Sequence, residues 1–322
     1  MPVRMFYKVR LSRADGFTLV EVLIVTVIIG ILLSLTLMAT HSARESVRSV
    51  TCQSNLRQLA LGLANHESAF GKFPSNGWGA YWVGDPDAGA LEKQPGCWLF
   101  SVLPYVEQSA IWAKASGKSP SEKLIALSES LESRVPVMVC PSRRGTELST
   151  YWGTNPLRNA LLPNVSFKTD YAGNGGTFSY NRLGPGGGSS TSENWLRRKL
   201  STGAFFIHTP HSTADFFDGL SNVFLIGDKY VRTKPTKTPP GRDIGDDQGA
   251  FVGDDVDNRR FGYLPPAKDG PSEGYELFGS RHASALNMCM CDGSCRSISY
   301  VVDRKVFHSL SNRLDGTLSA DF

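Results

Sequence analysis

Residues 17–39 read FTLVEVLIVTVIIGILLSLTLMA, and this stretch decides the fold class. It contains a single ionisable side chain, Glu21. An α-helix rises ~1.5 Å per residue, so the stretch is long enough to span the ~30 Å of hydrocarbon in a bilayer. We therefore predict that residues 17–39 form a membrane-spanning helix.

Positive charge before this stretch predicts its orientation in the membrane. Arg4, Lys8, Arg10 and Arg13 precede it, opposed only by Asp15, and the residues just after it carry no fixed charge. By the positive-inside rule, the N-terminus is expected in the cytoplasm and the bulk of the chain outside it. The predicted location is the inner (cytoplasmic) membrane, crossed once, with an extracytoplasmic head that can also belong to a periplasmic or cell-surface filament.

Two simpler types of N-terminal segment fit less well. A secretory signal peptide has an apolar region of only ~7–15 residues that ends at a small-x-small cleavage site. Here the small residue, Gly16, precedes the apolar stretch. A plain signal anchor leaves Glu21 unexplained, because a carboxylate in a membrane helix costs ~2.5–3.5 kcal/mol. The sequence therefore indicates that Glu21 has a partner.

Residues 16–21, GFTLVE, resemble the class III signal of type IV prepilins and type II secretion pseudopilins. In that family a prepilin peptidase cleaves after the glycine and methylates the new N-terminal phenylalanine, and the glutamate pairs with the free amine of a neighbouring subunit. The resemblance implies cleavage after Gly16, methylation of Phe17 and an assembly role for Glu21, with residues 1–16 as a cytoplasmic leader. The implied partners are the peptidase, other pilin-like subunits, the inner-membrane assembly machinery and the lipid bilayer.

Residues 40–72 are predicted to continue the helix beyond the membrane as an amphipathic segment. They contain no proline, and Pro74 marks the expected end of the helix. Their apolar residues recur on one helical face: Cys52, Leu56, Leu59, Ala60, Leu63 and Phe70. We predict that this face packs on a head of residues 73–322. The expected fold is α+β and pilin-like, with a long N-terminal helix packed on a β-rich head with long loops.

The head is rich in glycine, proline and short apolar runs. The runs predict strands at 135–140, 204–208, 223–227, 286–291 and 296–302. Short helices are predicted at 101–112, 124–132 and 304–314, the last with Asp303 as its N-cap. The stretch 232–275, rich in proline, glycine and aspartate, is predicted to run over the surface. The glycine-rich run 184–190 lacks the Gly-Lys-Ser/Thr ending of a phosphate-binding loop, so nucleotide binding is not expected.

A second resemblance lies in the C-terminal part of the head. His282, nine intervening residues and then Asp292-Gly293 match the spacing of the prepilin-associated H-x9-DG domain, which is frequent in planctomycetes. Segments beginning at Cys52, Leu103, Val139, Asp170, Asp218 and Gly279 resemble the same family. The chain departs from it after His282, where Ala-Ser-Ala replaces the usual Pro-Gly-Gly, and at Cys295, which replaces an aliphatic residue.

The motif residues are predicted to be structural. Asp292 and Gly293 lie between two apolar runs, which predicts a hairpin turn with glycine supplying a positive φ. His282 precedes the first of these runs and is expected to hydrogen-bond the turn or to lie at the surface. No nucleophile–base arrangement such as Gly-x-Ser-x-Gly or His-Glu-x-x-His is present, so we predict that the protein is not an enzyme.

Cysteines near His282 raise a zinc hypothesis. Their C-x-C-x3-C spacing differs from the C-x2-C of structural zinc sites, and an extracytoplasmic head favours disulfides. Two pairs are candidates: Cys291 with Cys295 across the turn, and Cys52 with Cys140 between the long helix and the head. Six cysteines allow 15 pairings, so the sequence leaves the connectivity open.

An acidic run offers a weak calcium site. Asp254, Asp255 and Asp257 carry the oxygen ligands that calcium prefers, and resemblance to the major pseudopilins implies a calcium site in the head. The run lacks the glycine and the distal glutamate of an EF-hand loop, and acidic runs are usually solvated surface. No other cofactor is predicted.

The predicted function is that of a prepilin-like subunit of a type IV pilus-like or type II secretion pseudopilus filament. Without the first sixteen residues the chain has 30 basic and 29 acidic side chains, so no nucleic-acid-binding face is indicated. The alternative is a monomeric, membrane-anchored binding module. Its candidate ligand contacts are aromatic: Trp78, Tyr81, Trp82, Trp152 and Trp195.

Overall fold

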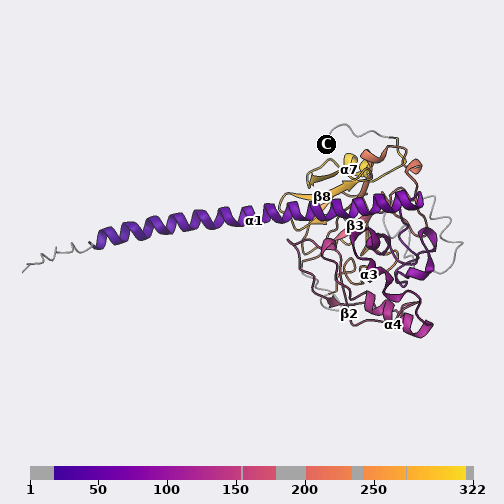
Figure 1. The fold of residues 1–322 in the computed structure, drawn as a ribbon. Coiled ribbons are helices and arrows are strands. Elements are labelled where there is room, and N and C mark those ends of the chain that lie inside the picture. Colours follow the sequence, from indigo (N-terminus) through magenta and orange to yellow (C-terminus); the bar gives the residue numbers. More distant parts are fainter. Residues whose placement is uncertain (1–17, 154, 179–200, 234–241, 273, 317–322) are drawn as a thin grey trace, which may run out of the picture. The chain divides into compact units, whose positions relative to one another are not determined.

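The computed structural model describes residues 18–153, 155–178, 201–233, 242–272 and 274–316. The chain divides into two units, Met1–Ser46 and Val47–Phe322. Helix α1, Leu19–Phe70, contributes residues to both units (Figure 1). Together with the strands of the second unit, this helix confirms the predicted α+β, pilin-like class.

The first unit contains the apolar part of α1. Its large apolar side chains are about half exposed or more, from Ile29 at 49% to Leu19 at 83%. Among the described residues, α1 is the one helix that is long and apolar enough to cross a membrane. None of the described residues of this unit covers these side chains, so their burial requires a bilayer or other chains.

The second unit begins with the amphipathic part of α1, whose apolar face is buried as predicted. Cys52, Leu56, Leu59 and Leu63 have no exposed surface, and neither has Ala60. Phe70, predicted on the same face, is 46% exposed. It is the last residue of the helix, and its ring packs on His66 with the centroids 4.7 Å apart. The next residue, Gly71, has a left-handed φ of 73°, and this conformation terminates the helix.

A five-stranded sheet forms the centre of the second unit, in the order β5-β3-β4-β8-β9. All neighbouring strands are antiparallel except β3 and β5, which are parallel. The strands are β3 Tyr171–Asn174, β4 Phe224–Asp228, β5 Arg259–Arg260, β8 Ala285–Met290 and β9 Cys295–Ser299. Two small two-stranded sheets pair β1 Ser149–Thr150 with β2 Val165–Ser166, and β6 Ala267–Lys268 with β7 Gly279–Ser280.

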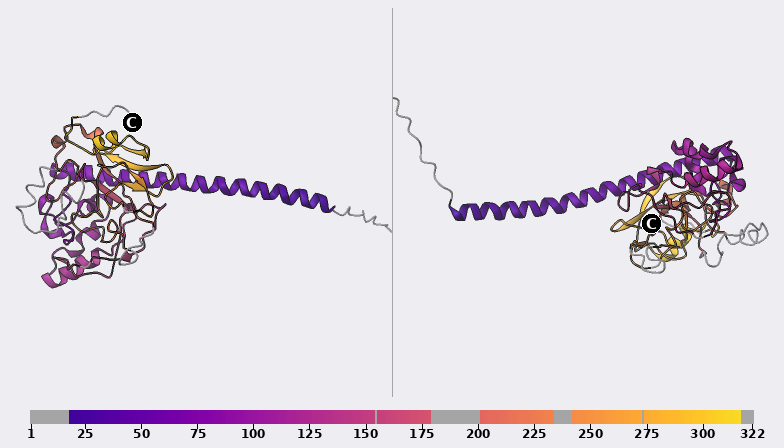
Figure 2. Two further views of the ribbon diagram at one scale, coloured as in Figure 1. Left: turned by 180° about the vertical axis from the view of Figure 1, so that it is seen from behind. Right: turned by 90° about the horizontal axis from the view of Figure 1, so that it is seen from below.

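The two faces of the central sheet belong to different apolar clusters. Tyr171 of β3 lies in the cluster that contains the α1 side chains, whereas Ala172 lies in the cluster of α7, Arg304–Leu310. Adjacent strand residues point to opposite faces. The sheet is therefore covered by the second part of α1 on one face and by α7, with Phe307 and Leu310, on the other (Figure 2).

Short helices make up much of the remaining structure. The α-helices are α2 Trp98–Val102, α3 Ser109–Trp112 and α4 Pro120–Ser130. The 3₁₀ helices are η1 Pro86–Ala88, η2 Leu91–Lys93, η3 Leu103–Val106, η4 Ala113–Ala115, η5 Pro136–Met138, η6 Thr213–Asp215 and η7 Leu220–Asn222.

Several local predictions are confirmed with shifted bounds. Strands predicted at 223–227, 286–291 and 296–302 correspond to β4, β8 and β9. The helix predicted at 124–132 begins earlier, at Pro120, because Ser119 and Glu122 form a capping box. The helix predicted at 304–314 ends at Leu310, and Asp303 caps it by accepting hydrogen bonds from the amides of Lys305 and Val306.

Two other local predictions are wrong, and a third is confirmed only in part. The strand predicted at 135–140 is the 3₁₀ helix η5, because Pro136 fixes φ and donates no ladder hydrogen bond. The strand predicted at 204–208 is a buried loop with one bridge, Phe206 to Thr209. The helix predicted at 101–112 is broken into α2, η3 and α3, with Glu107 left-handed at φ 62°.

The surface excursion predicted for 232–275 is also wrong in its central part. Residues 250–261 are buried, among them Phe251 and Val252 with no exposed surface. Val252 accepts a hydrogen bond from the Cys97 amide and forms a bridge with Val83. This segment therefore passes through the interior, although its composition is that of a loop. The glycine-rich run 184–190 lies outside the described residues.

Candidate functional site

The Glu21 carboxylate caps the start of α1. Its Oε2 accepts hydrogen bonds from the amide and the hydroxyl of Thr18, each at 2.8 Å. The Thr18 hydroxyl in turn accepts a hydrogen bond from the Glu21 amide at 3.3 Å. This is a Thr-x-x-Glu capping box, which satisfies donors that the first helical turn leaves open. Gly16 and Phe17, the predicted cleavage and methylation residues, lie outside the described residues.

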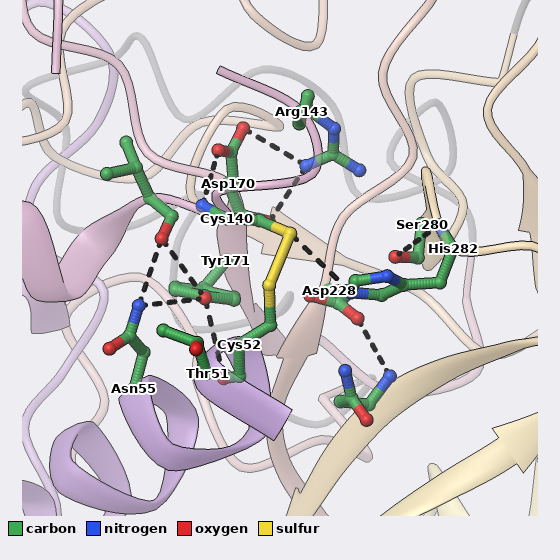
Figure 3. The surroundings of a disulfide bond; sticks show 12 residues. Thr51, Cys52, Asn55, Cys140, Arg143, Asp170, Tyr171, Asp228, Ser280 and His282 are labelled. Carbon is green, nitrogen blue, oxygen red and sulfur yellow. Dashed lines mark hydrogen bonds and ion pairs between the residues drawn. A yellow bond between two sulfur atoms is a disulfide. The ribbon is translucent and has the colours of Figure 1, made fainter. Parts of the chain in front are cut away.

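A disulfide joins α1 to the core of the second unit. It links Cys52 on α1 with Cys140, which follows η5, across 88 residues of sequence, and this is one of the two predicted pairs. Figure 3 shows that side chains around it connect the same two segments. Asn55 Nδ2 donates to the Val139 carbonyl at 3.0 Å, and the Tyr171 hydroxyl lies 3.4 Å from the Cys52 carbonyl and 3.3 Å from that of Val139.

His282 lies against this disulfide, away from the hairpin turn. Its Nε2 is 3.6 Å from Cys140 Sγ, and its ring is buried. The backbone amide of His282 donates to the Ser280 hydroxyl at 3.3 Å, and its carbonyl accepts from the Tyr300 hydroxyl at 3.1 Å. The prediction that His282 bonds the turn or lies at the surface is therefore wrong. The histidine of the motif contacts the disulfide sulfur.

Asp228, at the end of β4, interacts electrostatically with His282 in the same buried space (Figure 3). Its Oδ2 accepts a hydrogen bond from the Asn287 amide at 2.8 Å, whereas its Oδ1 has no hydrogen-bond partner among the described residues. Burial raises the pKa of Asp228 to about 6, although the hydrogen bond from the Asn287 amide, the charges of Arg143 and His282 and the Ser280 hydroxyl oppose the shift. The sequence analysis missed this residue, because no motif relates it to His282.

Ion pairs fix the Cys140 backbone from the other side. Asp170 Oδ2 accepts a hydrogen bond from the Cys140 amide at 2.8 Å. Its Oδ1 pairs with Arg143 at 3.1 Å and with Arg144 at 2.6 Å. Burial alone would raise the pKa of Asp170, but the two guanidinium groups outweigh it and hold that pKa below its usual value. Cys140 is therefore held in a rigid, charged surrounding on one side and against α1 on the other.

The second predicted disulfide is wrong in one partner. Cys295 is joined to Cys289, and Cys291 is a buried free thiol. Cys289 lies directly opposite Cys295 in the β8–β9 register, whereas Cys291 follows the end of β8. The pairing therefore depends on the strand register, which sequence spacing does not specify. In the disulfide state these sulfurs offer no thiolate to zinc.

The hairpin turn is confirmed. Gly293 has a φ of 85°, and Asp292 Oδ1 accepts a hydrogen bond from the Ser294 amide at 2.8 Å. A short polar side chain that bonds its backbone two residues on, followed by glycine, favours such a turn. Asp292 and Gly293 therefore set the return of β9 beside β8.

The predicted calcium ligands separate into two groups. Asp254 pairs with the buried Arg259 at 2.9 Å and accepts a hydrogen bond from Asn76. Asp255 and Asp257 instead gather with Asp247, with one oxygen of each within 4.8 Å of the others. Asp247, which the sequence analysis did not select, therefore takes the place of Asp254 in any cation site. Burial and the Asp257 charge raise the pKa of Asp247 to about 7.

Replacing Asp247 by asparagine is expected to stabilise the fold at pH 8. A carboxyl whose pKa is about 7 when folded, against 3.8 as a reference, binds its proton more tightly in the folded state. Its unfavourable contribution therefore begins to develop as the pH rises above 3.8, where the carboxyl of the unfolded chain ionises, and it is complete above pH 7. We expect D247N to raise the free energy of unfolding by up to about 4 kcal/mol at pH 8, by less than half of that at pH 5 and by little at pH 3.

The measurement is the free energy of unfolding by urea titration in EDTA. The adjacent Asp246 provides the matched control. Arg144 and Lys229 outweigh its burial and hold its pKa below the usual value, so D246N should destabilise at pH 8. A loss of stability in both variants would contradict the prediction that the charge of Asp247 is unfavourable in the folded state. Repeating the titration with added Ca²⁺ tests the calcium hypothesis, because a bound ion would stabilise the unsubstituted chain more than D247N.

An apolar pocket of about 550 Å³ lies elsewhere in the second unit. Its lining includes the rings of Phe70, Tyr105 and Trp112, together with His66, whose pKa burial lowers to about 4. Of the aromatic residues predicted as ligand contacts, the four that the structure describes do not line it. Trp78 packs on Trp82 with centroids 4.9 Å apart and donates to the Glu92 carbonyl. Tyr81 and Trp152 are half-buried, and Trp195 lies outside the described residues.

Comparison with known proteins identifies most of the chain. Residues 41–305 match a family described as "Protein of unknown function (DUF1559)". The chain belongs to this family. Residues 11–37 match the prokaryotic N-terminal methylation motif. No curated protein and no solved structure matches the chain.

The DUF1559 match and the methylation motif divide the candidate residues between them. The family region includes both disulfides, His282 and the Asp292–Gly293 turn, and the methylation motif includes Gly16, Phe17 and Glu21. The prediction of a prepilin-like protein with this domain is confirmed. The chain is a pilin-like precursor with a membrane anchor, and its family favours a structural role over an enzymatic one.

Proposed function

We propose that this DUF1559 protein is cleaved after Gly16 by a prepilin peptidase, methylated on Phe17 and assembled with other pilin-like subunits into a filament. The filament is of the type IV pilus or type II secretion pseudopilus kind. Before assembly the protein is held in the inner membrane by one helix, with the N-terminus in the cytoplasm and the second unit outside. The protein acts by packing and carries out no reaction on a substrate.

The observation that carries this proposal is the position of Glu21 within the methylation motif. It is the single ionisable side chain between Phe17 and Ala39, and it lies on an apolar helix whose side chains are exposed in the described part of its unit. In a bilayer a carboxylate of this kind is stabilised by a cationic partner. Cleavage after Gly16 creates such a partner, because it frees the amine of Phe17 four residues away in sequence.

The Thr18 cap is compatible with this role. Oε2 of Glu21 is the oxygen that accepts both hydrogen bonds of the capping box. A carboxylate has two oxygens and can accept several hydrogen bonds at once. Glu21 can therefore cap its own helix and accept hydrogen bonds from the amine of a neighbouring subunit.

The intact mass and N-terminal sequence of the membrane-extracted protein test the processing step. We expect a chain that begins at Phe17 and is heavier by one methyl group than the unmodified segment 17–322. Replacing Gly16 by a bulky residue in a matched variant should leave the chain unprocessed. A chain that still begins at Met1 in the presence of an active prepilin peptidase would overturn the proposal.

The apolar pocket supports a second candidate function, a membrane-anchored binding module. Among the described lining residues only His66 and Tyr105 are ionisable, and both are neutral at pH 7, because burial lowers the pKa of His66 to about 4 and raises that of Tyr105. Such a pocket favours a neutral, apolar or aromatic ligand. A processed chain that stays monomeric in the membrane, and whose Trp112 fluorescence responds to such ligands, would favour this function over the filament.

A further inference from the structure

The buried contact between His282 and the disulfide has no role in the filament proposal. His282 is the histidine of the H-x9-DG motif, and it is 142 residues from Cys140 in the sequence. The fold nevertheless places its Nε2 3.6 Å from Cys140 Sγ, with Cys52, Cys140 and His282 all buried. Figure 3 shows the ring pointing at the sulfur of Cys140 from the side opposite α1.

We propose that His282 is the general base that closes the Cys52–Cys140 disulfide during folding. The site would be a catalytic site that acts on the chain's own thiol and on no external substrate. Asp228 is a positioning residue, which stabilises the imidazolium that forms when His282 takes up the proton. This role is independent of the filament proposal.

The closing step needs a proton acceptor at the attacking sulfur. A thiolate, and not a thiol, attacks a disulfide, and burial disfavours the thiolate. Cys97 and Cys291 show this effect, since burial raises the pKa of the first to about 12 and that of the second well above its usual value. Cys140 lies in an equally buried position, but it has an imidazole nitrogen within hydrogen-bond distance of sulfur.

The oxidant is an external disulfide, for which oxidised glutathione serves as the probe. A first exchange joins Cys52 to one glutathione and releases the other as a thiol. The Cys140 thiol then gives its proton to His282 Nε2, and the thiolate attacks the Cys52 sulfur. The bond between Cys140 and Cys52 forms as the bond between Cys52 and glutathione breaks. Glutathione leaves with the electron pair and takes up a proton, so two thiols are oxidised and one disulfide is reduced.

Charges around the pair favour this transfer. Asp228 is ionised above pH 6, since burial raises its pKa to about that value, and its Oδ1 has no hydrogen-bond partner among the described residues. An ionised carboxylate beside an imidazole stabilises the protonated ring, as in nucleophile–base–acid arrangements generally. The other ionisable groups packed around the pair are Arg143, Asp170, Asp269, Tyr171 and Tyr300.

The second disulfide provides a control within the same chain. Cys289 and Cys295 form a disulfide across the hairpin. Within the described residues, no histidine forms a hydrogen bond with either sulfur. Both disulfides can be followed in one refolding reaction. A variant that merely folds slowly should therefore delay both of them.

The experiment refolds the reduced full-length chain into detergent with oxidised glutathione at pH 7 and pH 9. Samples are quenched with acid and alkylated, and each disulfide is quantified by peptide mass spectrometry. A thiol with the ordinary pKa of about 8.5 is about 3% thiolate at pH 7, and burial lowers that fraction further, so a base at the sulfur gives an advantage of about 30-fold or more. We expect H282Q to close Cys52–Cys140 at least about 30-fold more slowly at pH 7, and the difference to shrink at pH 9.

The control disulfide and a second variant make the result decisive. The closing of Cys289–Cys295 should be unchanged in H282Q, and D228N should slow Cys52–Cys140 in the same direction but less. In the unsubstituted chain, Cys52–Cys140 should close at a rate that varies less with pH than that of Cys289–Cys295. This last measurement needs no variant. Equal slowing of both disulfides, slowing that is the same at pH 7 and pH 9, or identical pH profiles would overturn the proposal.

Discussion

Replacing Glu21 with glutamine is expected to abolish assembly of the processed chain. Glutamine has the shape of glutamate and can still accept hydrogen bonds from Thr18, but it carries no charge for the Phe17 amine of a neighbouring subunit. Leaving one partner of a desolvated ion pair unpaired costs about 3–5 kcal/mol. We therefore expect the assembled fraction in membranes to fall by about 10²-fold or more, measured by cross-linking and by recovery of sheared filaments.

Thr18→Val is the matched control for this prediction. It removes the cap, which costs about 1 kcal/mol at a helix start, but it leaves the carboxylate available to a neighbouring subunit. Assembly of this variant should persist. The mass of each variant shows whether it has been cleaved and methylated, which separates an assembly defect from a processing defect. An E21Q chain that is processed and assembles normally would contradict the role of Glu21.

Removing the Cys52–Cys140 disulfide is expected to cause the largest loss of stability in the second unit. The cross-link closes 88 residues of sequence, and the chain-entropy account gives about 4–5 kcal/mol for a loop of that length. In a unit of this size such a loss should lower Tm by roughly 10 °C. The measurement is urea and thermal unfolding of the full-length C52A/C140A chain in detergent.

C289A/C295A is the corresponding control. Its disulfide closes only 6 residues of sequence, for which the same account gives about 2 kcal/mol. Both double variants remove two half-cystines and leave no new thiol, so the comparison isolates the loop length. Equal losses in the two variants would show that the long cross-link does not act by restricting the unfolded chain.

Features set by local chemistry were predicted well. The length and apolarity of 17–39 predict the helix, and the stripe from Cys52 to Leu63 is buried as its periodicity indicates. The Asp292–Gly293 turn and the Asp303 cap depend on neighbours within three residues. Thr18 could also have been recognised, because Thr-x-x-Glu before an apolar run is a capping-box signal.

Features that depend on strand register or on residues distant in sequence were not predicted. Cys295 pairs with Cys289 and not with Cys291, because β8 and β9 place those two residues opposite each other. The acidic run is buried and not solvated, because Arg259, Lys168 and Lys229 supply compensating charge from other segments. Composition alone cannot show such compensation.

By itself the sequence determined the membrane anchor, its processing motif, the long helix and the turns, since each depends on residues that are adjacent along the chain. Only the tertiary structure decided what His282 contacts. Asp228 and Cys140 reach it from different segments, across 142 residues of sequence in the case of Cys140. Their meeting depends on how the central sheet and α1 pack together, because side chains so far apart in sequence are brought together by packing alone and leave no local pattern.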